Sequence, residues 1–120
     1  MDFKTFPKTS GMEYNVLTSF ACGESHFEGF LELGTKLFLK DAGGQPVMET
    51  FIPLEQIEFM KIRGNVLEIR VFPSAVTSFT AFISARRRGF VKRLAADIAQ
   101  KAGMGKRFFL NEWYGEVYNR

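Results

Sequence analysis

The charge of this chain changes abruptly near residue 85, and its hydrophobic pattern changes at the same place. Residues 1–85 contain 7 Lys or Arg and 10 Asp or Glu, a net charge of −3, whereas residues 86–107 contain 8 Lys or Arg and one acid, Asp97, a net charge of +7. Residues 108–120 return to −1. Apolar residues alternate as in strands before the change and recur at helical spacing after it. The break therefore predicts a β-rich body followed by one basic helix.

Short alternating segments separated by turn residues precede the break. We expect strands over 13–22, 26–33, 36–41, 48–52, 57–63, 66–72 and 79–83. Gly23–Ser25, Gly34-Thr35 and Gly64-Asn65 are turn signals, and Leu54–Gln56 is expected to form a single turn that leads into the strand over 57–63. About seven strands at this spacing are typical of an antiparallel barrel or sandwich.

The basic segment predicts a single helix. Ser84 is expected to cap it, and Gly103 is a suitable C-terminal stop. Between them Phe90, Leu94 and Ile98 recur at a spacing close to 3.6 residues. One amphipathic helix can cover the apolar mouth of a partly open barrel.

The expected fold is mainly β with one C-terminal α-helix. Specifically, we expect a pleckstrin-homology-like barrel of about seven antiparallel strands capped by the helix. Residues 13–120 would form this single domain after a flexible lead-in at residues 1–12. A lone cysteine, Cys22, fits a reducing compartment, and no signal peptide or apolar span is evident, so a cytoplasmic protein is expected.

Four stretches of the chain form a recognisable set: Gly34–Leu39, Phe51–Phe59, Phe79–Ser84 with the basic helix that follows, and Met104–Phe109. Together they resemble an uncharacterised bacterial family of short proteins encoded beside mannose-class sugar phosphotransferase systems. Members of that family are considered regulators of those systems, so the resemblance implies a regulatory role linked to sugar uptake. It supplies no catalytic residue. This chain departs from the family pattern at Leu54, where a tryptophan is usual.

The basic residues after the break form the first candidate site. Arg86, Arg87, Arg88, Lys92 and Arg93 could bind an anion or a partner beside a helix N-terminus. The alternative is a solvated helix face whose long stems cover apolar neighbours. Three consecutive arginines also point in different directions, so not all could share one ligand.

Two kinds of anionic ligand are disfavoured for this cluster. Lipid-binding pleckstrin-homology domains carry basic residues on the first strand–turn–strand, whereas the turn at residues 22–26 carries Glu24 and no Lys or Arg. Nucleic acid is not expected, because one short helix reaches only a few phosphates.

Cys22 and His26 form the second candidate site. A turn between them would place the two side chains opposite each other on a hairpin, where an imidazolium could favour a thiolate. No orienting acid is evident except Glu24 or Glu28, and those same acids would repel a phosphoryl group on His26. We expect no catalytic residue, no metal site and no cofactor.

Aromatic residues gather near the C-terminus. Trp113 and Tyr114 could bind a partner or a second copy of the chain, or the segment could dock on the barrel. An edge strand could also accept an added strand. We therefore expect a non-enzymatic cytoplasmic binding module that contacts a protein partner through the basic helix and these aromatics. The alternative is an adaptor for anionic membrane surfaces or phospholipid head groups.

Overall fold

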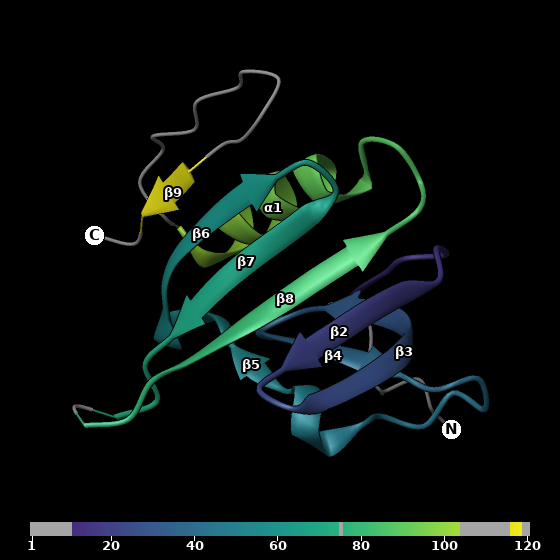
Figure 1. The fold of residues 1–120 in the computed structure, drawn as a ribbon, viewed down its shortest axis with the longest axis horizontal. Helices are drawn as coiled ribbons and strands as arrows, with labels where there is room; N and C mark the ends of the chain where they lie inside the picture. The colour runs from purple at the N-terminus through teal and green to yellow at the C-terminus, as the bar shows by residue number, and fades with distance from the viewer. Residues whose placement is uncertain (1–10, 75, 104–115, 119–120) are drawn as a thin grey trace, which may run out of the picture.

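The structure, a computed structural model, describes residues 11–74 and 76–103 and the backbone of 116–118 (Figure 1). The first half of its sheet contains β1 (Met12–Glu13), β2 (Thr18–Cys22), β3 (Ser25–Leu33), β4 (Lys36–Lys40) and β5 (Ile52–Pro53). The second half contains β6 (Ile57–Arg63), β7 (Val66–Val71), β8 (Phe79–Ala85) and β9 (Glu116–Tyr118). Two 3-10 turns, η3 (Met48–Thr50) and η4 (Leu54–Gln56), flank β5, and the α-helix is α1 (Phe90–Ala102).

The strands form one antiparallel sheet in the order β5-β4-β3-β2-β8-β7-β6-β9, with β1 paired beside β3. From β2 to β8 each strand lies beside its neighbour in the chain, except that β5 and β6 do not pair. The last of these strands, β8, returns to pair with the first, β2. The mainly β class with one C-terminal helix is confirmed. The predicted closure of the sheet into a barrel is not confirmed, because the described sheet is open between β5 and β6.

Helix α1 packs on β6, β7 and β8, and Figure 1 shows it behind β6 and β7. Its apolar side is fully covered: the buried residues are Phe90, Val91, Leu94, Ala95, Ile98 and Ala99. They join the inward side chains of the sheet in one hydrophobic cluster. Each large apolar side chain buried in this way contributes about 1.5–3 kcal/mol, so packing rather than helix propensity holds α1 in place. The helix ends at Gly103, as predicted, in a left-handed conformation with φ of 69°.

The expected single strand over 13–22 is interrupted. Glu13 lies opposite Glu32 and Thr18 lies opposite Gly29, so the four residues 14–17 face the two residues 30–31. The two additional residues on this side form a bulge that separates β1 from β2. The bulge forms because Tyr14 packs edge-on against Phe90 of the helix, with ring centroids 5.7 Å apart.

The expected strand over 48–52 is also wrong. Residues 48–50 form the turn η3, and only Ile52 and Pro53 pair with β4. The reason is Thr50, whose buried side chain takes the place of a strand. Its hydroxyl accepts the N–H of Leu39 at 2.8 Å and donates to the carbonyl of Val47 at 2.7 Å. A side chain thus satisfies the backbone group that a neighbouring strand would have paired.

Candidate functional site

The three consecutive arginines precede the helix instead of forming its first turn. Ser84 does not cap α1, because it lies within β8 and pairs with Ser19 and Val66 on the neighbouring strands. The helix starts after Gly89, which is left-handed at φ of 79° and provides no side-chain cap. Arg86, Arg87 and Arg88 therefore occupy an exposed connection between strand and helix. Gly89 permits the sharp change of direction there, since a positive φ costs glycine little.

A groove of about 710 Å³ lies where this connection leaves the sheet. Four segments of the chain line it: Val16, Leu17 and Ser19, then Glu28, then Asn65, and finally the consecutive residues Ser84, Ala85, Arg86 and Arg87. The strand register explains which side chains form the floor of this groove. Ser19 is opposite both Ser84 and Glu28, so these three side chains form one row across the outer face of β8, β2 and β3.

The groove has charged and apolar parts. Arg86 and Arg87 are exposed and form no ion pair within 4.0 Å with any described residue. Glu28 lines the same groove and accepts a 3.4 Å hydrogen bond from the Ser19 hydroxyl. Leu17 is 58% exposed, unusual for a leucine so close to the core. The bulge of residues 14–17 places it there.

The other basic residues of the predicted cluster are separate from the groove. Arg88 is exposed but does not line it, and Lys92 is half-buried on the helix. Arg93 is near Tyr14, where its charge opposes the rise in the pKa of the phenol. That rise is caused first by burial and then by the hydrogen bond to Asp97. The structure thus brings Arg86 and Arg87 together and distributes Arg88, Lys92 and Arg93 elsewhere.

Cys22 and His26 do not form a pair. The turn has two residues rather than three, so Cys22 is opposite Ser25 and His26 is opposite Ala21. Side chains alternate along a strand, so the two residues lie on opposite faces of the sheet. Cys22 packs against the core, and burial raises the pKa of its thiol. Both findings argue against an activated thiolate at this position.

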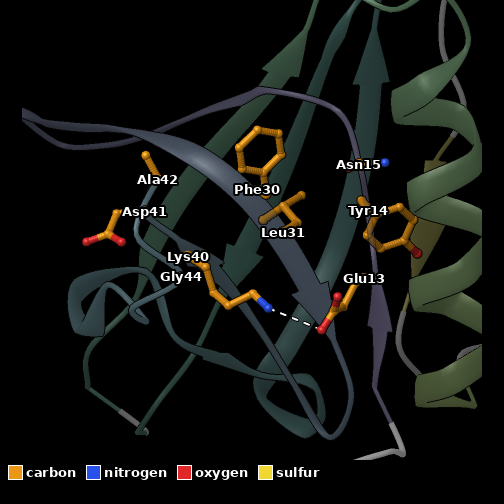
Figure 2. Close-up of a pocket in the computed structure, with 9 residues that line it drawn as sticks. All are labelled: Glu13, Tyr14, Asn15, Phe30, Leu31, Lys40, Asp41, Ala42 and Gly44. Atoms are coloured by element: carbon orange, nitrogen blue, oxygen red, sulfur yellow. Dashed lines mark hydrogen bonds and ion pairs between the residues drawn. The ribbon is translucent and has the colours of Figure 1, made fainter.

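A second hollow, of about 380 Å³, lies beside β1 and the turn after β4 (Figure 2). The Lys40 ammonium in it is 3.2 Å from a Glu13 oxygen and 3.1 Å from a Glu32 oxygen. Hydrogen bonding to Glu32 is the main cause that raises the pKa of Lys40. Asp41 is equally occupied, because its carboxylate accepts the N–H groups of Gly43 and Gln45. The charged groups of this hollow therefore serve the fold. Their cluster was not predictable from the sequence, because it depends on the β1–β3–β4 register.

The aromatic residues expected to bind a partner, Trp113 and Tyr114, lie outside the described residues. The backbone of β9 pairs with the edge of β6 at Phe59–Lys61, so the chain near its C-terminus adds a strand to the sheet. Among the described residues no group of three or more His, Cys, Asp and Glu could hold a metal ion. No helix in this part of the chain has the length and apolar character needed to cross a membrane.

Comparison of the chain with protein-family models, curated proteins and solved structures finds no match.

Proposed function

We propose that this chain is a non-enzymatic binding module that contacts a protein partner through the groove at Arg86 and Arg87. The observation that carries this proposal is that one groove holds an exposed leucine, Leu17, beside two arginines that form no ion pair with any residue the structure describes. Lys40 differs from them, because two carboxylates neutralise its ammonium group. The guanidinium groups at the groove remain available for carboxylates, which they bind in a bidentate manner.

The dimensions of the groove fit an extended acidic segment. It reaches from Glu28 on β3, across β2 and β8, to Asn65 in the β6–β7 turn. Neighbouring strands are about 4.8 Å apart, so three spacings give about 14 Å, the length of about four extended residues. Acidic side chains would pair with the arginines, and an apolar side chain would cover Leu17.

We also propose a pleckstrin-homology-like architecture and a regulatory role linked to sugar phosphotransferase uptake. The architecture is supported by the consecutive strands, the return of β8 to β2 and the single helix packed on β6–β8. The regulatory link rests on the resemblance of the four stretches quoted above. Copurification of a sugar phosphotransferase component with the tagged protein from its own cells would support the link, and its loss in the groove variant would connect the two proposals.

The groove is tested by NMR titration with a short acetylated peptide of Glu and Leu residues. We expect saturable shifts at Ser19, Ser84 and Arg86, and none with a peptide in which Lys replaces Glu. The variant Arg86→Ser with Arg87→Ser should bind about tenfold or more weakly, since it loses two charge-assisted contacts. The matched control is Lys36→Ser with Lys101→Ser, which removes the same charge at the start of β4 and at the far end of α1, away from the groove, and should bind normally. Equal weakening by both variants would reduce the effect to net charge and refute a specific site.

An anionic membrane surface is the second candidate, because exposed Leu17 lies beside two arginines. Basic residues contribute about 1 kcal/mol each at a charged leaflet, so two or three of them bind weakly without an apolar anchor. In a co-sedimentation assay, the wild type should then pellet with vesicles that contain phosphatidylserine, whereas the Leu17→Ser variant should stay in the supernatant. Binding that is equal for phosphatidylserine and phosphatidylcholine vesicles, or absent from both, would eliminate this candidate.

A further inference from the structure

One edge of β3 is open between Ser25 and Glu28. The carbonyl of Leu31 accepts the N–H of Tyr14 at 3.0 Å, so the backbone groups of Leu31 point toward β1 and β2. Backbone groups alternate along a strand, so those of His26 and Glu28 point to the other edge. There β4 pairs with β3 only from Phe30 onward. No hydrogen bond within the described chain satisfies the outward N–H and C=O groups of His26 and Glu28.

We infer that a second copy of this chain pairs with that edge, antiparallel and about a two-fold axis at Phe27. In this arrangement His26 of each copy lies opposite Glu28 of the other. Both residues direct their N–H and C=O groups outward, so the two copies exchange four backbone hydrogen bonds. A two-fold axis makes the contact self-complementary and closed, the usual geometry of a homodimer.

The side chains favour this register over its neighbours. His26 and Glu28 are exposed on the same face, and each imidazole can donate to the carboxylate opposite it. Shifting the pairing in one direction would oppose Glu28 to Glu28, and His26 to Phe30, whose edge β4 already occupies. Shifting it in the other direction would oppose Glu28 to Glu24. The favoured register is the one that pairs an acid with a donor at both positions.

Only two residues of each copy exchange backbone hydrogen bonds, so the dimer is weak. Its main consequence is the way it places the two grooves. The two-fold axis is perpendicular to the sheet, so the outer faces of the two copies lie on the same side. Glu28 lines the groove and also belongs to the pairing edge. The two grooves therefore lie next to each other on one continuous surface. The inference itself does not depend on what the groove binds.

Sedimentation velocity on the full chain, at concentrations up to about 1 mM, tests the pairing. The wild type should show a reversible monomer–dimer equilibrium. His26→Pro removes an outward N–H that the monomer does not use, and an edge strand tolerates such a proline. It should be monomeric throughout, whereas His26→Ala keeps the N–H and should dimerise about tenfold more weakly through loss of two side-chain pairs.

An exchange of the two side chains provides a second test if the proline variant does not fold. His26→Glu and Glu28→His should each weaken the dimer, because like groups then face each other. The double variant restores the pairing and should recover the wild-type dissociation constant. A wild type that stays monomeric, a His26→Pro variant with unchanged association, or a double variant without recovery would overturn the inference.

Discussion

The Tyr14 hydroxyl donates a 2.7 Å hydrogen bond to the Asp97 carboxylate, 83 residues further along the chain. This bond joins the bulge between β1 and β2 to the outer side of α1. The Tyr14 ring also meets Phe90 edge-on, so both ends of the side chain hold the bulge against the helix. The same bulge exposes Leu17 in the groove, which makes Tyr14 a positioning residue for the proposed site.

Tyr14→Phe should lower the free energy of unfolding by about 1 kcal/mol, because it removes one partly buried hydrogen bond to a charged acceptor and keeps the ring. Urea denaturation gives the value. Tyr14→Ala should cost more, since it also removes the contact with Phe90. Equal values for the two variants would show that the ring contributes nothing.

Stability should decline at high pH through Tyr14. Burial, and after it the bond to Asp97, raises the pKa of this phenol above its ordinary 10.0. The unfolded chain loses its proton near the ordinary value while the folded chain retains it, so alkali favours unfolding. The contribution is complete below pH 10 and is lost as the pH rises toward the folded pKa. Tyr14→Phe should decline less steeply above pH 10 than the wild type, and parallel curves would contradict this assignment.

Gly29→Ala should destabilise the fold by about 1–3 kcal/mol, the usual range for steric overlap in a packed interior. A Cβ at this position would overlap the carbonyl oxygen of Lys40, where the backbones of β3 and β4 meet closely. Gly34→Ala is the matched control, because its Cβ would meet its nearest neighbour, the Cα of Gly11, at 3.7 Å. Thermal unfolding of both variants provides the comparison, and similar melting temperatures would refute the close approach.

Thr50→Val should cost about 1–3 kcal/mol despite its similar shape. The substitution leaves the buried N–H of Leu39 without its acceptor, and an unsatisfied buried donor carries the full cost of desolvation. Thr50→Ser keeps the hydroxyl and should lose much less. If urea denaturation gives Thr50→Ser a lower free energy of unfolding than Thr50→Val, the packing of the methyl group matters more than the hydrogen bond.

Cys22 should react slowly with iodoacetamide in the folded protein at neutral pH and rapidly after unfolding. Burial raises the pKa of the thiol, and the thiolate is the reactive form. His26→Ala should leave the rate unchanged, because the imidazole lies on the other face of the sheet. A slower reaction in that variant would revive the idea of a Cys22–His26 pair.

Hydrophobic periodicity in the sequence was sufficient to predict β3, β6, β7 and the helix. Each of these elements has a strong period and a glycine at an adjoining turn or stop. It could not predict the bulge at residues 14–17, since Tyr14 is held by Asp97 and Phe90 from the far end of the chain. Nor could it predict that a Thr50 hydroxyl would replace a strand. The consecutive arginines were found, but a run of like charges does not tell which two will border a groove. That depends on where β8 ends and Gly89 turns.

The pairing of β2 with β8 also affects how the protein is made. While a ribosome is still synthesising the second half of the chain, β2 has its hairpin partner β3 but lacks the strand that completes its other side. Such long-range closure is slow, because chain entropy must be lost before the contacts form. The nascent protein should therefore resist proteases only after β8 and α1 have left the exit tunnel, with its first hairpin exposed to chaperones until then.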